Sequence, residues 1–193
     1  LNAPILLVDN LNDGYEYEIT EYLSKHLSKD GTIYLLGGKS SISSNLVNEL
    51  NSFGYKNFKR LGGSDRFDTN NIIVNELNVQ SGTPVVIVNG FNFPDALSIS
   101  SIAASKGYPI FMSNQDAVQD STLQKISSIK PSKIYVIGGE GALSSNIESQ
   151  LKGNLSYLKD DDIVRISGSD RYDTSLKIDN YFKLDSKYAV LAN

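Results

Sequence analysis

The chain contains Arg60-Leu-Gly-Gly-Ser-Asp-Arg-Phe-Asp-Thr69 and, 105 residues later, Arg165-Ile-Ser-Gly-Ser-Asp-Arg-Tyr-Asp-Thr174, with seven of ten positions identical. The flanking sequence repeats as well. Pro4 and Pro109 are again 105 residues apart, and a Gly-Gly pair at 37–38 returns at 138–139. Self-similarity at a fixed period is the signature of a repeat architecture. The sequence therefore predicts tandem modules with a period of about 105 residues.

This period divides the chain unevenly. Residues 1–55 correspond to the C-terminal half of a first repeat, residues 56–155 to a complete module, and residues 163–193 to the N-terminal part of a third repeat. We expect the chain to be part of a longer array. Because incomplete copies would leave strand edges unpaired, we also expect residues 163–193 to dock against residues 1–55.

Short apolar runs alternate with helical patterns along the complete copy. The runs at 85–88, 108–112 and 133–137 predict strands that are buried on both faces, and helical spacing follows at 96–103 and 118–129. In the first half-copy, residues 3–8 and 33–36 predict strands and residues 15–27 a helix. This alternation predicts the α/β class, with a mostly parallel sheet flanked by helices in each module.

The composition excludes several functions. The chain of 193 residues has a net charge of −4, no cysteine and one histidine, His26. The negative charge argues against nucleic acid as a partner, and no apolar run is long enough to span a membrane. One histidine without cysteine makes no zinc site, and no catalytic triad is signalled. We expect no cofactor, no metal and no catalysis by this chain.

The repeated arginine box has a structural and a functional interpretation. Asp65 and Asp170 stand where a helix N-cap belongs, and Asp68 could reach back as in a capping box. An arginine of the box could pair with one of these carboxylates. The functional interpretation is that the arginines present planar forks to phosphate or carboxylate groups of a polymer. These are Arg60, Arg66, Arg165 and Arg171.

A second segment, Asn89-Gly-Phe-Asn-Phe-Pro-Asp-Ala-Leu-Ser98, directly follows the 85–88 strand. Asn-Gly predicts a tight turn, and Pro94 suits the first turn of a helix. Phe91 could stack on a sugar ring, whereas packing is the favoured interpretation of Phe93. The pairs Gly37-Gly38 and Gly138-Gly139 fit no phosphate-loop pattern, so we interpret them as tight turns at strand ends.

These motifs together resemble the cell-wall-binding repeat type 2 family of Gram-positive surface proteins. The resemblance rests on the arginine box with its Thr69, on Phe-Pro-Asp-Ala-Leu-Ser, on Ala-Pro-Ile-Leu-Leu and on the Ile-Gly-Gly-x-x-Ala-Leu-Ser turn, and it covers essentially the whole chain. It implies modules of a toprim-like α/β fold, three of which typically form a pseudo-threefold assembly. It also implies family features at Arg60, Asp65, Arg66, Phe93, Pro94 and Asp95, and at Arg165, Asp170 and Arg171.

The resemblance further implies a function. We expect a non-catalytic module that anchors a secreted surface protein non-covalently to an anionic cell-wall polysaccharide, and possible association with further repeats of the same protein. One alternative is part of an autolysin of the N-acetylmuramoyl-L-alanine amidase type, with its catalytic domain outside this chain. The other alternative is a structural surface-layer protein.

Overall fold

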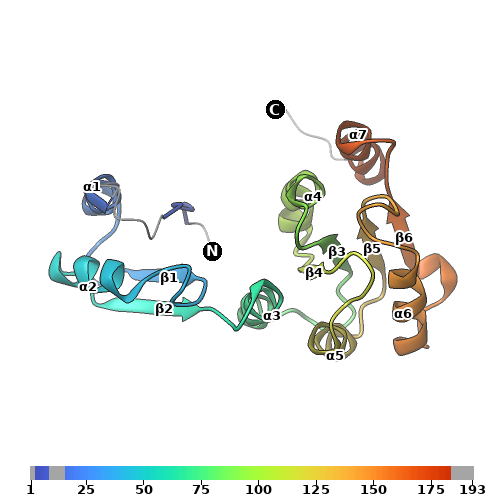
Figure 1. The fold of residues 1–193 in the computed structure, drawn as a ribbon, viewed down its shortest axis with the longest axis horizontal. Coiled ribbons are helices and arrows are strands. Elements are labelled where there is room, and N and C mark those ends of the chain that lie inside the picture. The colour runs from blue at the N-terminus through green and yellow to red at the C-terminus, as the bar shows by residue number, and fades with distance from the viewer. Residues whose placement is uncertain (1–2, 9–15, 184–193) are drawn as a thin grey trace. The chain divides into compact units, whose positions relative to one another are not determined.

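The computed structural model describes residues 3–8 and 16–183, and it divides the chain into two compact units, Leu1–Ile73 and Val74–Asn193 (Figure 1). Within the described residues, no helix is both long and apolar enough to cross a membrane.

Unit 1 contains a small parallel sheet covered by helices. Its elements are α1 (Glu16–His26), β1 (Thr32–Leu36), α2 (Ser44–Ser52) and β2 (Asn57–Leu61), and α3 (Arg66–Glu76) begins in this unit. Strands β1 and β2 pair in parallel, with Leu35 opposite Arg60. The core of the unit is formed by Leu23, Leu46, Leu50 and Tyr55.

Unit 2 contains a four-stranded sheet of parallel pairs in the order β4-β3-β5-β6. Its elements in chain order are β3 (Val85–Asn89), α4 (Phe93–Lys106), β4 (Ile110–Ser113), α5 (Asp120–Ile129), β5 (Ile134–Ile137), α6 (Asn146–Asn154), the 3-10 turn η1 (Asp160–Asp162), β6 (Ile163–Ile166) and α7 (Arg171–Phe182). The predicted α/β class, with parallel sheets flanked by helices, is confirmed.

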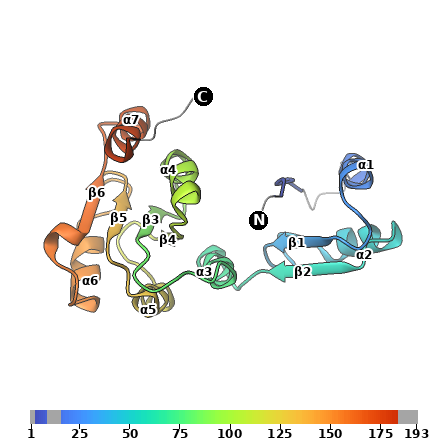
Figure 2. The ribbon, with the colours of Figure 1, turned by 180° about the vertical axis from the view of Figure 1, so that it is seen from behind.

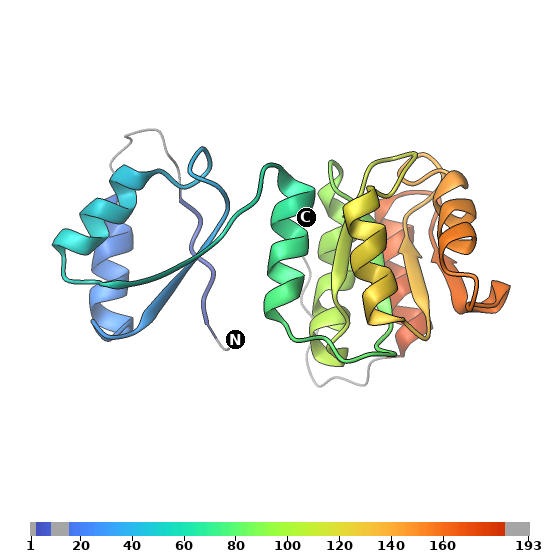
Figure 3. The same cartoon turned by 90° about the horizontal axis from the view of Figure 1, so that it is seen from below.

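Both faces of the larger sheet are buried. Along β3, Val85 and Ile87 face a core that α5 and α6 complete, while Val86 and Val88 face a core shared with α4 and α7. Figures 2 and 3 show this arrangement, with α4 and α7 on one face and α5 and α6 on the other. Successive side chains of a strand point to opposite faces, so a strand covered on both sides is apolar throughout.

The strand predicted at residues 3–8 is wrong, because the structure assigns no strand there. Pro4 corresponds to Pro109, which precedes β4, and β4 pairs with β3. Residues 3–8 and 16–73 contain no counterpart of β3, so residues 3–8 have no neighbouring strand with which to pair. Leu6 and Val8 still pack against the core of unit 1.

The described part of residues 163–193 belongs to unit 2, and the predicted docking of these residues on residues 1–55, within one chain or between two, stays a prediction. Strand β6 pairs with β5, α7 packs against α4, and Ile178 lies in the core of unit 2. Strand β6 thus covers an edge of β5 that would otherwise be unpaired. Residues 184–193, including the predicted strand at 189–192, lie outside the described residues. The division into sequence copies stays a prediction.

Candidate functional site

The carboxyl ends of β3 and β5 form a topological switch point in unit 2. These two strands are neighbours, but α4, which follows β3, covers one face of the sheet, whereas α6, which follows β5, covers the other. The loops after such strands diverge, and ligands of open parallel sheets bind at this place. We call this edge of the sheet the carboxyl edge.

Asn89 ties the loops of the carboxyl edge together. Its Oδ1 accepts hydrogen bonds from the backbone N–H groups of Phe91 (2.7 Å) and Asn92 (3.1 Å). Its Nδ2 donates to the carbonyl oxygen of Ala142 (2.5 Å), in the loop after β5. The sequence predicted only that Asn89 lies in a turn. Its bond to Ala142 spans 53 residues, which no local pattern could signal.

Arg165 of β6 stabilises the Gly138-Gly139 turn through hydrogen bonds to backbone carbonyl groups. Its Nη1 donates to the carbonyl oxygens of Gly138 (2.8 Å) and Leu143 (2.7 Å), and its Nη2 donates to that of Ser144 (3.3 Å). The guanidinium also forms a bidentate pair with Glu148, whose Oε1 lies 2.7 Å from Nε. The side chain is 17% exposed, so this bonding leaves little of the fork for a ligand.

Arg60 occupies the same place in unit 1. Its Nη1 donates to the carbonyl oxygens of Gly37 (2.9 Å) and Gly38 (3.2 Å). Val47 stands where unit 2 has Glu148, so the carboxylate partner is missing from the first copy. The first arginine of each box thus bonds to a Gly-Gly turn.

The two aspartates of each box form the entrance of a helix. The carboxylate of Asp65 accepts hydrogen bonds from the N–H groups of Phe67 and Asp68, both at 2.8 Å, and Asp170 caps α7 by accepting from Asp173 N–H at 2.8 Å. Asp68 reaches back to the N–H of Ser64 (2.9 Å), one residue before the N-cap position that a capping box would use. Both boxes therefore start their helices in the same way.

The threonine of each box and the glycine before its serine, Gly63 or Gly168, complete this entrance. Thr69 Oγ1 accepts from Gly63 N–H (3.0 Å), and Thr174 Oγ1 accepts from Gly168 N–H (2.9 Å). A Cβ atom at residue 63 would lie 2.5 Å from Cγ of Asp68, so the fold requires glycine there. Most polar groups of the box thus have a structural partner.

Arg171 and Asp95 differ from the rest of these motifs. Arg171 is exposed at the start of α7, and no hydrogen bond or ion pair of its guanidinium is found within the described residues. Asp95, in the first turn of α4, is only 6% exposed, and its carboxylate likewise accepts no hydrogen bond from the described residues. A Cβ atom at residue 138 would lie 2.6 Å from Oδ2 of Asp95, so glycine makes room for it. Burial raises the pKa of Asp95, and the charge of Arg171 opposes this rise.

Three aromatic residues near this pair in the sequence are exposed. Phe91 is 64% exposed, Phe93 69% and Tyr172 64%. Phe93 precedes Asp95 by two residues, Tyr172 follows Arg171, and α4 and α7 pack side by side. The packing interpretation of Phe93 is therefore wrong. Arg66, which corresponds to Arg171, is also exposed, at the start of α3.

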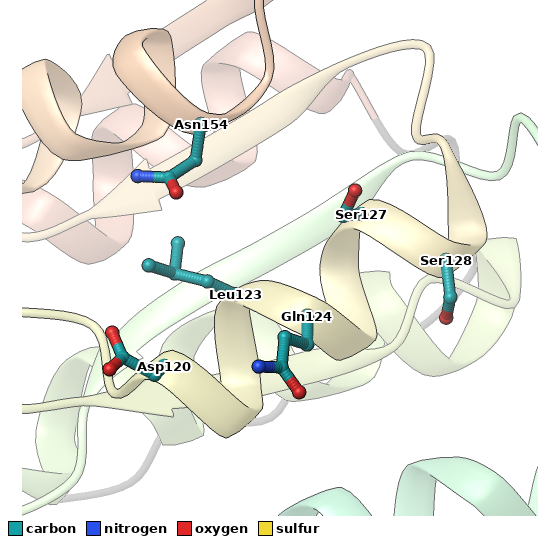
Figure 4. A pocket seen from close by; sticks show the side chains of 6 residues that line it. All are labelled: Asp120, Leu123, Gln124, Ser127, Ser128 and Asn154. Atoms are coloured by element: carbon teal, nitrogen blue, oxygen red, sulfur yellow. The ribbon is translucent and has the colours of Figure 1, made fainter.

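A separate hollow of about 510 Å³ lies along α5 (Figure 4). None of the residues predicted to be functional line it, and the lining offers neither a basic nor an aromatic side chain. The lining residues are Asp120, Leu123, Gln124, Ser127, Ser128 and Asn154. Within the described part of the chain, no group of three acidic, histidine or cysteine side chains could hold a metal ion. His26 contacts the ring of Tyr22, with ring centroids 4.4 Å apart.

Comparison with known proteins defines the class. Residues 60–148 match the model of cell wall binding domain 2 (CWB2), and this part of the chain belongs to that family. The resemblance predicted from the motifs is confirmed, and the chain contains a cell-wall-binding domain over these residues.

The particular relatives include an amidase, an amidase enhancer and Cwp6. N-acetylmuramoyl-L-alanine amidase LytC of Bacillus subtilis (strain 168) is 30% identical over 192 residues, which cover 100% of this chain and 36% of the relative. The amidase enhancer of the same organism is 31% identical over 195 residues and is covered to 24%. The structure of Cwp6 from Clostridium difficile is similar, with a TM-score of 0.73 and 29% identity over 86% of this chain and 26% of Cwp6. The chain thus spans about a third or less of these relatives.

The first prediction compares the two arginines of one box. Arg165→Gln should lower the free energy of unfolding by about 3 kcal/mol, because it leaves the mostly buried Glu148 and several carbonyl groups without their donor. The matched variant Arg171→Gln should stay within about 0.5 kcal/mol of the wild type. Urea denaturation, with hydrogen exchange of the β5 amides, measures both. Equal losses in the two variants would contradict the different roles of these arginines.

The second prediction concerns pH. The folded-state pKa of Asp95 is raised, so its contribution to stability is fully present below the ordinary value of 3.8 and is lost as the pH rises through the folded-state pKa. Asp95→Asn should therefore melt at a higher temperature than the wild type at pH 7, and this difference should shrink toward pH 3.

Asp173 is the control, because a hydrogen bond from Ser169 N–H and the charge of Lys177 lower its pKa. Its contribution is present above the ordinary value and is lost as the pH falls, so Asp173→Asn should melt below the wild type at pH 7. If Asp95→Asn also melts below the wild type at neutral pH, the carboxylate of Asp95 has a stabilising partner and our description of it is wrong.

Proposed function

We propose that the chain anchors a secreted surface protein non-covalently to the cell wall by binding an anionic wall polysaccharide at the carboxyl edge of unit 2. The observation that carries the proposal is the exposed Arg171, whose planar fork is not used within the described residues. A guanidinium matches the geometry of phosphate and carboxylate groups and binds them through paired hydrogen bonds.

The net charge of −4 does not exclude an anionic ligand. Charges are screened beyond about 10 Å at ordinary salt, so the ligand senses the groups near it rather than the whole chain. Arg171 stands at the N-terminus of α7, and the N-termini of α4 and α7 add partial positive charge. Arg66 is a second exposed cation, at the equivalent place of the other arginine box.

The parent protein is the second part of the proposal. LytC is an amidase by its name, and it supports a parent of the autolysin type whose catalytic domain lies outside these residues. The CWB2 match supports a binding role for the chain itself, without catalysis or a cofactor. Further repeats of the same parent are proposed neighbours, since modest affinities add up when several modules bind one polymer.

Binding to wall material tests this function. The chain should sediment with purified walls that retain their anionic polymer and should stay in solution when that polymer has been stripped. Arg171→Gln should weaken binding about tenfold, which corresponds to about 1.4 kcal/mol and to the lower end of the range for hydrogen bonds to charged groups. Binding should also weaken as salt is added.

Lys106→Gln is the matched control, because it removes the same charge at the other end of α4. A helix of 14 residues is about 20 Å long, beyond the range of screened charges. Lys106→Gln should therefore leave binding unchanged. Equal sedimentation with stripped and intact walls would overturn the proposal.

A further inference from the structure

Asp95 is only 6% exposed, its carboxylate oxygens still reach the surface, and they lack hydrogen-bond donors within the described residues. Burying an ionised group without a partner is unfavourable, and buried polar groups are normally hydrogen-bonded. Neighbouring parts of the chain nevertheless make room for this group, because residue 138 has no side chain where Oδ2 of Asp95 lies. The fold therefore accommodates the carboxylate of Asp95 without supplying hydrogen-bond donors to it.

The nearest charge does not supply these donors. Arg171 acts on Asp95 through its charge, but no ion pair within 4.0 Å joins the two side chains in the described structure. The two groups therefore stay separately available at one edge of the sheet. A ligand that satisfied both would bring hydroxyl or N–H donors to Asp95 and an acceptor to Arg171.

The surroundings favour a sugar as the source of the donors. Phe91 and Phe93 are exposed and lie within four residues of Asp95 in the sequence, and the exposed Tyr172 follows Arg171 directly. The C–H face of a sugar ring is apolar, while its hydroxyl groups donate hydrogen bonds in the plane of the ring. An aromatic ring can pack against the C–H face of the sugar, while a neighbouring carboxylate accepts hydrogen bonds from its hydroxyl groups.

We propose that Asp95 is a specificity-determining residue that accepts hydrogen bonds from hydroxyl groups of a sugar ring in the wall polymer, while one of the exposed aromatic side chains covers the face of that ring. This inference rests on the proposed function and deepens it. Arg171 binds the anionic group of the polymer, and Asp95 distinguishes the sugar that carries or adjoins it.

Charge-free oligosaccharides separate the two roles. They are prepared from the wall polymer by removing its phosphate groups or reducing its carboxylates, and their binding to the full chain is measured by titration calorimetry. The wild type should bind them with little dependence on salt. Asp95→Asn should weaken this binding at least tenfold, because a hydrogen bond to a charged acceptor is lost. Arg171→Gln should weaken this binding less than Asp95→Asn does, whereas it should weaken binding of the intact polymer.

One control variant and three aromatic variants make the outcome specific. Asp120→Asn alters a carboxylate that lines the hollow on α5, and it should not change oligosaccharide binding. Phe93→Ala and Tyr172→Ala, made separately, should each keep the fold because both side chains are exposed, and at least one of them or Phe91→Ala should weaken binding about tenfold.

The possible failures are distinguishable. If the intact polymer binds but the charge-free oligosaccharides do not, the sugar site is refuted and the anionic anchor stands. If Asp95→Asn binds the oligosaccharides as well as the wild type does, Asp95 is not the specificity-determining residue. If the intact polymer itself does not bind, the proposed function fails.

Discussion

The hydrogen bonds of Arg165 hold the turn after β5, and the carboxyl edge of unit 2 depends on that turn. One guanidinium binds three carbonyl groups and the carboxylate of Glu148, so the loop from Gly138 to Ser144 is fixed from within the fold. Gly138 then lies beside Asp95, and Ala142 accepts a hydrogen bond from Asn89. Arg60 holds the corresponding turn of unit 1, although Val47 replaces the carboxylate partner.

The residues of the arginine box have different roles. The first arginine of the box is mostly buried in unit 2 and is used by the backbone, while the aspartates and the threonine start the next helix. Arg171 remains at the surface, where the box meets Asp95 of the neighbouring helix. A motif that is dense in charge can therefore be largely structural and still present one cation to a wall polymer.

Local patterns predicted the parts of the structure that depend on local causes. The run at 85–88 is apolar throughout because both faces of β3 are covered. Asp170 caps a helix by accepting a hydrogen bond from a residue only three positions away. Residues 3–8 have the same apolar character, but a strand also needs a neighbour, and no strand stands beside them in the described residues. The roles of Asn89, Glu148 and Gly138 arise from contacts between distant segments, so the sequence alone could not reveal them.

The central claim is that the wall polymer binds at the carboxyl edge of unit 2. Backbone amide chemical shifts of the full chain, followed by NMR while soluble wall polymer is added, test it most directly. The account predicts that shift changes concentrate at residues 89–95, 138–141 and 168–172. Changes confined to α5 and Asn154, around the hollow of Figure 4, would contradict it and would move the binding site to the other face of the sheet.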